Sequence, residues 1–474
     1  MHCTALLSAL IAHTSTFTCQ WPIALADNVA TRVKMAQNDS LSRLYTATSH
    51  QEVSPPPLKR RRLTQTPSLA LDSPRTSSTL QSAGQTRSSS PSKNAFRVFS
   101  WNINGINAFL SSTPSARKIT SYFTESTKTQ KSGTASTDAP PNASRLRTPL
   151  GQAPSGSPHS LRAFLGRHNW PEILFLQELK IKPQDGPARL PKILSALNTP
   201  LNAADSVSDH RTYNLNAVLP RDKHNAKAFG GKLYGVGTIM RTDFARKWVA
   251  TVREVDWDIE GRVSVVEMRA APEGQDENGP VTKPLALINV YAVNGTTQPY
   301  RNPLTGAVHP NYPTRHDRKL IFHSLLRDEC LSLEARGFSV VVAGDVNIAR
   351  GPADGHPNLR AFPEQHCFNR VDFNTKFFGE EDNKRAGAYV GTQDEKTEKC
   401  LDAVDVFRAK YGMEKRYTYY PNRGEWGSSC DRVDMVFVSK EVWDDGRVID
   451  TGILDTPQER GPSDHVPFWV KVAL

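Results

Sequence analysis

Six short polar motifs recur along the chain, and each lies at the end of an apolar, strand-like run. They are Trp101-Asn102-Ile103-Asn104-Gly105, Gln177-Glu178, Tyr291-Ala292-Val293-Asn294, Gly344-Asp345-Val346-Asn347, Asp431-Arg432-Val433-Asp434 and Ser463-Asp464-His465. Carboxylates, amides, a phenol and an imidazole delivered to one rim of a β-structure can hold a divalent metal against a phosphodiester. The series therefore indicates a metal-dependent phosphodiesterase.

Two of the motifs supply carboxylates at strand ends. Glu178 follows the buried run Ile173–Leu176, where a hard oxygen ligand suits Mg²⁺. Asp345 and Asn347 follow four apolar residues and alternate at period two, so their side chains share one side. The Asp can orient or deprotonate a water, and the Asn amide can donate to developing negative charge. The alternatives are a surface glutamate and an Asx turn that caps the strand.

Asp434 and His465 form a potential carboxylate–imidazole pair. An Asp that accepts from one ring nitrogen fixes the tautomer and raises the basicity of the other nitrogen. Asp464 can face a metal at the same time. Taken alone, a histidine in this position is more often structural or solvated, and only the neighbouring motifs favour function.

A phenol, an amide and a guanidinium complete the set. Tyr291 and Asn294 end the run Leu285–Tyr291, and a phenol at that rim can donate to a phosphate oxygen. Arg262 precedes another strand and can fork a phosphate. The alternatives are an ordinary half-buried tyrosine and an arginine that pairs with an acid of the fold.

Strand-like runs must position these side chains. The runs between turn signals are Ala95–Trp101, Ile173–Leu176, Tyr234–Met240, Val263–Met268, Leu285–Tyr291, Phe338–Ala343, Arg432–Val438 and Phe468–Val472. Apolar residues at helical spacing predict helices over Asp317–Arg336 and Cys400–Tyr411. Mixed strands with a few helices predict two packed sheets with helices outside.

The motifs occur jointly and in an order that resembles the exonuclease III type of AP endonuclease, a branch of the endonuclease/exonuclease/phosphatase superfamily. Gly235-Val236-Gly237 and Glu260-Gly261-Arg262-Val263 add to the match, which covers roughly residues 96–474 without an insert at about 111–160. The resemblance implies an α/β, DNase I-like, four-layer sandwich of two packed mixed sheets flanked by helices. It also implies Mg²⁺-dependent hydrolysis 5′ to an abasic site, with 3′-repair or 3′–5′ exonuclease activity as variants.

The resemblance implies a role for each matching residue. The implied metal ligands are Asn104, Glu178, Asp345, Asn347, Asp464 and His465, with Mg²⁺ as the metal and Mn²⁺ as an alternative. The implied catalytic residues are Asn102, Tyr291, Asp345, Asn347, Asp434 and His465, with Asp345 handling the attacking water and Asp434 orienting His465. The implied DNA contacts are Arg262, Asn294, Tyr419 and Tyr420.

One departure from the family pattern bears on the substrate. Members that cut abasic DNA often place a Trp three residues before the position of Asp434, where this chain has Asp431. An acid there weakens an apolar sugar slot and leaves abasic-site preference open. Superfamily cousins that act on inositol phosphates, RNA tails or phosphotyrosyl-DNA generally carry a His, within Asn-x-His-Leu, at the position of Tyr291. These cousins, and a catalytically dead DNA-binding protein, are the alternatives.

Composition separates two flexible regions from the folded one. The net charge is +11, and residues 1–95 and 111–160 together carry +10 of it. We expect residues 1–94 to be disordered and residues 95–474 to form one domain that the low-complexity insert interrupts. Because the positive charge lies in these arms, it does not by itself indicate a DNA-binding face on the folded part. The six cysteines show no zinc-ligand spacing, and no apolar run reaches the roughly 18–20 residues that span a bilayer.

The flexible regions contain two short motifs. Lys59, Arg60, Arg61 and Arg62 form a proline-flanked basic run that favours nuclear import over a plain solvated charge run. Ile119, Tyr122 and Phe123, within 116–123, resemble a sliding-clamp-binding peptide without its usual Gln, although chance occurrence is the stronger alternative. We expect a nuclear monomer that acts on duplex DNA with abasic sites or blocked 3′ ends. Mitochondrial or secretory targeting by residues 1–34 stays an alternative.

Overall fold

The computed structural model describes residues 95–110, 159–202, 205, 208–226, 234–270, 282–390 and 399–474. The predicted disorder of residues 1–94, nearly all of the insert, the basic run 59–62 and the clamp-binding candidate 116–123 lie outside these residues. Those expectations, and the domain boundaries drawn from them, stay predictions.

The first sheet has six strands, in the order β13-β14-β1-β2-β4-β3. Their bounds are Val448–Ile453, Phe468–Ala473, Ala95–Asn102, Ile173–Gln177, Val236–Arg241 and Tyr213–Val218. β1 and β2 are parallel, whereas the other neighbours are antiparallel, so the sheet is mixed. The parallel pair matters for the site, because Asn102 lies opposite Gln177 and both strands end at the same edge.

The second sheet also has six strands, in the order β10-β12-β8-β7-β6-β5. Their bounds are Ala403–Asp405, Asp434–Ser439, Ser339–Asp345, Leu285–Tyr291, Val263–Met268 and Val249–Glu254. β7 and β8 are parallel, which aligns Tyr291 with Asp345, and antiparallel β12 places Asp434 opposite Asp345. A short pair of β9 (Gly355–His356) and β11 (Cys430–Asp431) lies outside the two main sheets.

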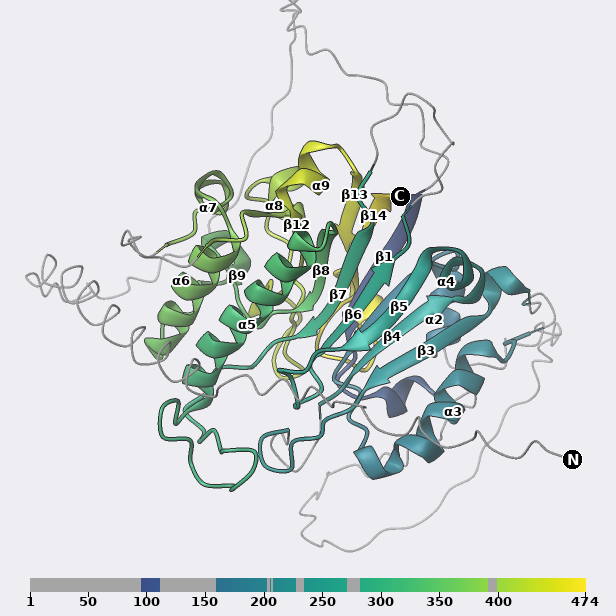
Figure 1. Ribbon diagram of the computed structural model, residues 1–474, viewed down its shortest axis with the longest axis horizontal. Coiled ribbons are helices and arrows are strands. Elements are labelled where there is room, and N and C mark those ends of the chain that lie inside the picture. The colour runs from purple at the N-terminus through teal and green to yellow at the C-terminus, as the bar shows by residue number, and fades with distance from the viewer. Residues whose placement is uncertain are drawn as a thin grey trace, which may run out of the picture. The chain divides into compact units, whose positions relative to one another are not determined.

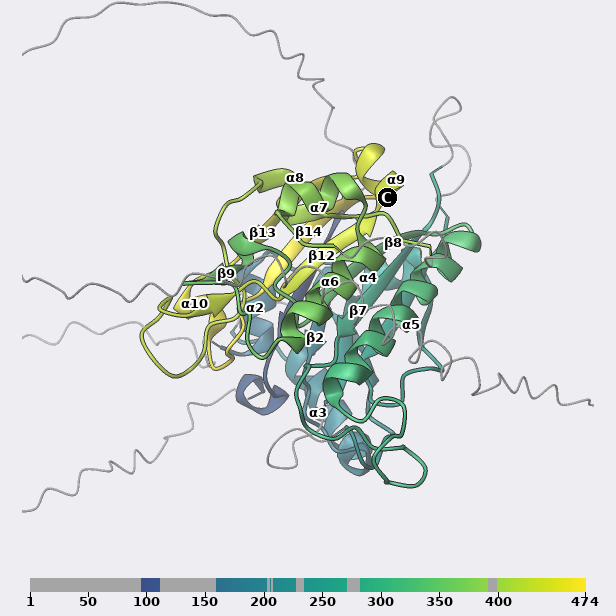
Figure 2. The same cartoon turned by 90° about the vertical axis from the view of Figure 1, so that its left-hand side faces the viewer.

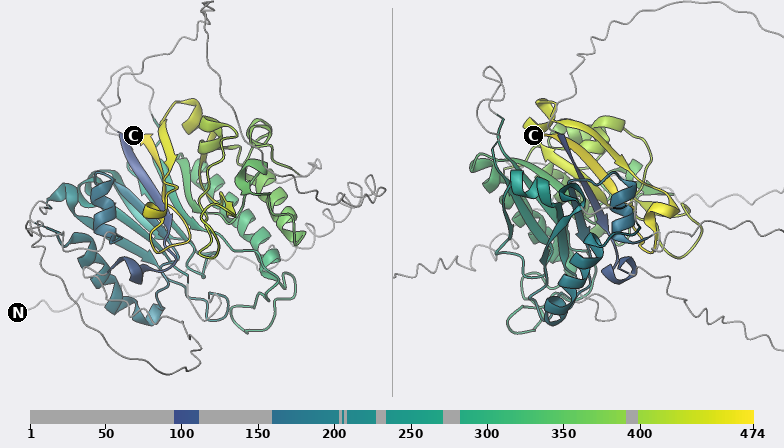
Figure 3. Two further views of the ribbon diagram at one scale, coloured as in Figure 1. Left: turned by 180° about the vertical axis from the view of Figure 1, so that it is seen from behind. Right: turned by 90° about the vertical axis from the view of Figure 1, so that its right-hand side faces the viewer.

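Helices cover the outer face of each sheet (Figure 1). The bounds of α2 to α10 are Leu161–Arg167, Gly186–Asn198, Thr242–Trp248, Arg315–Ala335, Gln365–Phe377, Glu380–Ala386, Val406–Tyr411, Lys440–Asp444 and Pro457–Arg460. α2 and α3 pack on the first sheet, and α5 and α6 pack on the second, as Figures 2 and 3 also show. The predicted four-layer α/β sandwich of two mixed sheets flanked by helices is confirmed.

Strand periodicity explains why polar residues meet at one edge. Side chains of a strand alternate between its two faces. In β1, Phe96 and Val98 pack between the sheets, and the same face continues to Asn102. In β8, Val341 and Ala343 lead in the same way to Asp345. The space between the sheets is therefore apolar along most of its length and polar at one rim.

One predicted helix needs correction. The segment Cys400–Tyr411 was expected to be helical throughout, but Ala403–Asp405 forms strand β10 and the helix begins only at Val406. β10 pairs with β12 at the edge of the second sheet. The Asp405 side chain accepts a hydrogen bond from the Arg408 backbone N–H, so it caps α8 and ends the strand. Within the described ranges, no helix is long and apolar enough to cross a membrane.

Candidate active site

A buried polar layer separates the apolar core from the polar rim. Gln177 Nε2 donates to Ser100 Oγ at 3.0 Å and to Asn289 Oδ1 at 2.8 Å. Asn289 in turn donates to the Gly237 carbonyl at 3.0 Å. These bonds cross from the first sheet to the second, and they fix how β1, β2 and β7 align. Because a buried amide without partners is costly, the layer also penalises a slip of one sheet past the other.

Asn102 lies at the centre of the rim. Its Nδ2 donates to Glu178 Oε1 at 3.2 Å and to Asp345 Oδ2 at 3.0 Å, so one amide joins a carboxylate of each sheet. The backbone carbonyl of Asn102 accepts a hydrogen bond from Ser463 Oγ at 2.6 Å. The family resemblance implies a catalytic role for Asn102. In this structure both protons of its amide are directed at carboxylates, so its observed contribution is to position them.

Glu178 is held by three donors. Tyr291 Oη donates to Glu178 Oε1 at 2.7 Å, and Lys180 Nζ lies 2.6 Å from Glu178 Oε2, in addition to the Asn102 contact. Burial alone would raise the pKa of the Glu178 carboxyl, but the Lys180 ammonium and the hydrogen bonds outweigh it, so the pKa lies below its ordinary value. Glu178 is therefore a carboxylate at neutral pH.

Asp345 and Asn347 form a tight turn at the end of β8. The Asn347 backbone N–H donates to Asp345 Oδ1 at 2.8 Å, and Asn347 Nδ2 donates to the Ala292 carbonyl at 3.1 Å. From α5, the buried Lys319 donates through Nζ to the Asn347 carbonyl at 2.7 Å. The Asx turn considered from the sequence is present, and it also directs Asp345 into the rim. Burial raises the pKa of Asp345 to about 7, and the neighbouring carboxylate of Asp434 acts in the same direction.

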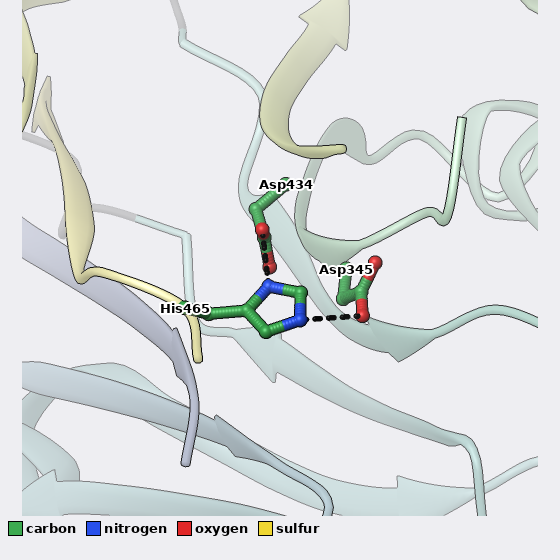
Figure 4. Close-up of side chains that lie close together, drawn as sticks. All are labelled: Asp345, Asp434 and His465. Atoms are coloured by element: carbon green, nitrogen blue, oxygen red, sulfur yellow. Dashed lines mark hydrogen bonds and ion pairs between the residues drawn. The ribbon is translucent and has the colours of Figure 1, made fainter. Parts of the chain in front are cut away.

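Asp434 and His465 form the expected pair (Figure 4). His465 Nδ1 lies 2.7 Å from Asp434 Oδ2, and His465 Nε2 lies 3.9 Å from Asp345 Oδ2. Burial alone would lower the pKa of the His465 imidazole, but Asp434 and Asp345 outweigh it and raise the pKa to about 10. Thr418 Oγ1 accepts from the Asp434 backbone N–H at 3.0 Å and so fixes the start of β12.

The carboxylate and amide oxygens of the rim suit a hard divalent cation. Asn104 Nδ2 donates to Asp464 Oδ1 at 2.8 Å. The Lys180 ammonium contacts both Glu178 and Asn104 Oδ1, so a positive charge already lies between two of the expected ligands. Asp434 Oδ1 is buried and has no hydrogen-bond partner among the described residues. Oxygen-rich sets of this kind suit Mg²⁺ or Mn²⁺. Ligand atoms of Asp345, Asp434 and His465 lie within 4.8 Å of one another, and these residues, together with Asn104, Glu178 and Asp464, are the ones that would hold the ion.

Backbone strain is concentrated at this rim. Of the seven described residues other than glycine with positive φ, four belong to the site: Asn104, Glu178, Lys180 and Asn347, with φ of 50°, 56°, 55° and 54°. A left-handed conformation costs a side chain about 1–3 kcal/mol and persists only where the surroundings enforce it. The clustering supports a functional role for the rim.

The structure thus brings the expected residues together. A continuous set of hydrogen bonds and ion pairs links Asn102, Asn104, Glu178, Tyr291, Asp345, Asn347, Asp434, Asp464 and His465. The role of each residue in metal binding or catalysis stays a prediction.

Comparison with known proteins decides the family. The sequence matches the Endonuclease/Exonuclease/phosphatase family over residues 99–465, a span that contains all six motifs. The chain belongs to this family. A search of curated proteins found no match to the sequence.

The solved structures that resemble the chain include an AP endonuclease and a 3′ phosphatase. The catalytic domain of Xenopus laevis APE2 is 17% identical, with a TM-score of 0.47 and coverage of 80% of this chain and 93% of that chain. The AP endonuclease LMAP from Leishmania major is 18% identical, with a TM-score of 0.47 and coverage of 80% and 88%. The 3′ phosphatase NExo from Neisseria, bound to product DNA, is 16% identical, with a TM-score of 0.40 and coverage of 80% and 100%. At these scores the neighbours' activities do not transfer to the present chain.

Two of the four expected DNA contacts in this family member need correction. Arg262 is 1% exposed, and its guanidinium pairs with Glu260 and donates to the Tyr291 carbonyl, so it cannot reach a phosphate. It pairs with an acid of the fold, as the alternative interpretation stated. Tyr420 is 5% exposed, and its ring stacks on Trp426 with centroids 3.9 Å apart. Trp426 therefore covers the face of the Tyr420 ring on which a DNA base would have to stack.

The other two expected contacts are accessible. Asn294 is exposed after β7. Tyr419 is half-buried, and its ring centroid lies 5.1 Å from that of His465. Both positions are compatible with contact to a substrate at the rim, and their role in DNA binding stays a prediction.

Asp431, the departure from the family pattern, is paired in the structure. It lies in β11, and its Oδ2 lies 3.5 Å from Arg360 Nη2. Burial raises the pKa of the Asp431 carboxyl, while Arg360 acts against this rise. The nearby guanidinium reduces the repulsion that an acid would exert on a phosphate.

An ionic network buried beside the rim holds two site loops in place. Arg432 donates to Asp354 Oδ1 at 2.7 Å and to Asp405 Oδ2 at 2.7 Å, while Arg408 also contacts Asp354 and Arg350 also contacts Asp405. Arg350 follows Asn347 closely and Arg432 precedes Asp434, so the network ties the end of β8 to the start of β12. Truncating one partner would leave an unpaired buried charge.

Sequence reasoning missed three residues of the site. Lys180 lies two residues after Glu178, and a search for a cation at that spacing would have found it. Lys319 lies within α5, and Thr418 lies in a loop, each far along the chain from the residue it contacts. No local pattern marks these two residues.

Proposed function

We propose that the chain is a Mg²⁺-dependent DNA phosphodiesterase of base-excision repair, of the AP endonuclease and 3′–5′ exonuclease III type. The observation that carries the proposal is the position of Asn102, whose amide contacts both Glu178 and Asp345 and so joins carboxylates from both sheets at one rim. Membership of the endonuclease/exonuclease/phosphatase family supports phosphoester chemistry.

The chain's own groups suit hydrolysis. Asp345 is placed to accept the proton of an attacking water, and a raised pKa makes its carboxylate a stronger base than an exposed aspartate. Asp434 holds His465 through Nδ1, so the other ring nitrogen, Nε2, is directed at Asp345. The raised pKa of His465 keeps the ring protonated near neutral pH, where its charge can stabilise a phosphate oxygen. When bound, the Mg²⁺ ion supplies Lewis-acid stabilisation of negative charge on the phosphate.

Tyr291 supports the exonuclease III branch over the superfamily cousins. Those cousins generally place a histidine there, whereas this chain places a phenol that donates to Glu178 at 2.7 Å. A catalytically inactive DNA-binding protein is a weaker alternative. Such a protein has no need to hold Glu178 and Asp345 beside a paired His465.

We infer the substrate to be duplex DNA with an abasic site or a blocked 3′ end. Half-buried Tyr419 beside His465 and exposed Asn294 support contact with a DNA strand at the rim. Asp431 leaves open which lesion is preferred, although its pairing with Arg360 moderates the repulsion. We further propose a nuclear monomer, with import directed by Lys59–Arg62 and the sliding clamp as a candidate partner of residues 116–123.

A panel of three DNA duplexes tests the proposal. The duplexes contain a tetrahydrofuran abasic analogue, a 3′-phosphoglycolate end, or no lesion, and each is incubated with pure protein with and without Mg²⁺. We expect Mg²⁺-dependent cleavage of at least one lesion duplex, and the ratio between the two lesions reports the effect of Asp431.

The matched control is Glu178→Gln, which keeps the size of the side chain and removes its charge. We expect it to abolish cleavage of every duplex while leaving the protein folded. If wild-type protein cleaves none of the three duplexes, or if Glu178→Gln cleaves as well as wild type, the proposed enzyme activity is wrong.

A further inference from the structure

The loop between β9 and α6, residues 357–364, presents an aromatic ring to solvent. Phe362 is 86% exposed, and Arg360 in the same loop has a side chain that is 57% exposed. Phe362 is the only phenylalanine among the described residues that is so exposed. Single apolar residues are common on protein surfaces, so exposure alone implies no function. The anchoring and position of this loop are the informative features.

The loop has a fixed backbone. Arg370 of α6 is buried, and its Nη2 donates to the Arg360 carbonyl at 2.6 Å. Cys367 Sγ donates to the Ala361 carbonyl at 3.5 Å. Two consecutive carbonyls are therefore tied to the helix that follows, immediately before Phe362. A ring held in this way loses little backbone entropy when a ligand covers it.

The same contacts connect the loop to the active-site rim. Nε of Arg370 donates to the Ala349 carbonyl at 2.8 Å, two residues beyond Asn347. On its other side the loop follows β9, which pairs with β11, and Arg360 reaches Asp431 of β11 at 3.5 Å. Tyr419 in turn bridges Asp431 and His465 through backbone pairing. The ring is thus carried on a segment that is fastened to both sides of the site.

We propose that Phe362 stacks on an unpaired or partly unstacked nucleobase of the bound DNA, with Arg360 beside the adjoining phosphate. This inference rests on the proposed function. An abasic site, or a frayed 3′ end, leaves the flanking base without a stacking partner on one face, and an aromatic ring replaces that partner. Stacking of a base on an aromatic side chain contributes about 1–3 kcal/mol. Every base has a π face, so this contact recognises the gap and no particular sequence.

The experiment measures DNA binding by fluorescence anisotropy without Mg²⁺, so that affinity is separated from cleavage. Wild type is compared with Phe362→Ala, Phe362→Trp and the control Met413→Ala, which truncates another exposed apolar residue. We expect Phe362→Ala to weaken binding of the tetrahydrofuran duplex by about 5- to 150-fold, the equivalent of 1–3 kcal/mol. We expect a smaller loss on intact duplex, and wild-type affinity for Phe362→Trp and Met413→Ala.

A kinetic measurement adds an independent readout. Because Phe362 does not touch the reacting groups, the cleavage rate constant at saturating enzyme should be unchanged in Phe362→Ala. Only the enzyme concentration that gives half of the maximal rate should rise. Unchanged DNA affinity in Phe362→Ala overturns the inference, as does an equal loss in Met413→Ala. A third contrary result is sedimentation in which wild type self-associates and Phe362→Ala does not, because Phe362 would then lie in an interface between two copies of the chain. If wild type binds the lesion duplex through Phe362 but never cleaves it, the proposed activity fails while the base contact stands.

Discussion

The hydrogen bond from Tyr291 to Glu178 gives the sharpest test of how the rim is assembled. Replacing Tyr291 by Phe removes one O–H that donates to Glu178 Oε1 at 2.7 Å. The ring itself is buried, and it packs against Tyr234 and the Arg262 guanidinium with centroid distances of 5.4 Å and 4.9 Å. Phenylalanine preserves these ring contacts, so the substitution isolates the hydroxyl.

The magnitude follows from the partners that remain. A hydrogen bond to a charged group is worth about 1.5–3 kcal/mol. Glu178 keeps Asn102 and Lys180 as donors, so the carboxylate is not left unpaired and the fold should lose only about 1 kcal/mol. If the hydroxyl holds Glu178 in the catalytic geometry, the whole bond is lost from the transition state. We then expect a fall in the cleavage rate constant of about 10- to 150-fold.

The assay is single-turnover cleavage of the tetrahydrofuran duplex at saturating enzyme and Mg²⁺, with thermal unfolding as a check on stability. Tyr234→Phe is the matched control, because Tyr234 belongs to the same aromatic cluster and has no hydrogen bond to Glu178 in this structure. We expect the control to cleave at the wild-type rate. A wild-type rate in Tyr291→Phe, or an equal loss in both variants, would refute the role given to this contact.

Three further predictions concern the ionisable side chains of Lys180, Arg262 and His323. In Lys180→Met the ammonium that balances Glu178 and Asn104 is absent, so Mg²⁺ should raise the melting temperature more than it does in wild type; an equal or smaller rise would contradict the fit to a cation. Arg262→Met leaves Glu260 with less compensation and should cost about 3–5 kcal/mol in urea unfolding, whereas lost DNA affinity at unchanged stability would restore the DNA-contact interpretation. Burial lowers the pKa of His323 from 6.5 to about 4, so the unfolded state binds its proton first and stability falls as pH drops from about 6.5 to about 4. The loss attributable to His323 approaches about 3 kcal/mol, and urea titrations at several pH values should show a shallower fall in His323→Gln.

Much of the architecture was predictable because strands carry their signal locally. Val263–Met268 and Leu285–Tyr291 appear as strands with the expected bounds, since alternating or continuous β-forming residues end there at turn signals. The polar residues at the ends of β1, β2, β7 and β8 converge because β1 is parallel to β2 and β7 is parallel to β8, so that the ends of each pair lie at one edge.

The failures arise where distant residues decide the outcome. Arg262 looked available for phosphate because Tyr234, whose ring its guanidinium covers, and Arg315, which shares Glu260 with it, lie elsewhere in the chain. Cys400–Tyr411 has helical spacing, but pairing of β10 with β12 and capping by Asp405 divide it. Lys319 approaches Asn347 only after α5 packs beneath β8, which no short window of sequence records.

The central claim is that Asp345 accepts a proton from water at a metal-assisted phosphodiesterase site. Single-turnover cleavage of the lesion duplex by wild type and Asp345→Asn, each treated with chelator and then restored with Mg²⁺, tests it most directly. We predict that wild type is active only with Mg²⁺ and that Asp345→Asn falls by about 10²–10⁴-fold while its DNA affinity is retained. Cleavage by wild type in chelator, or a wild-type rate in Asp345→Asn, would contradict the claim.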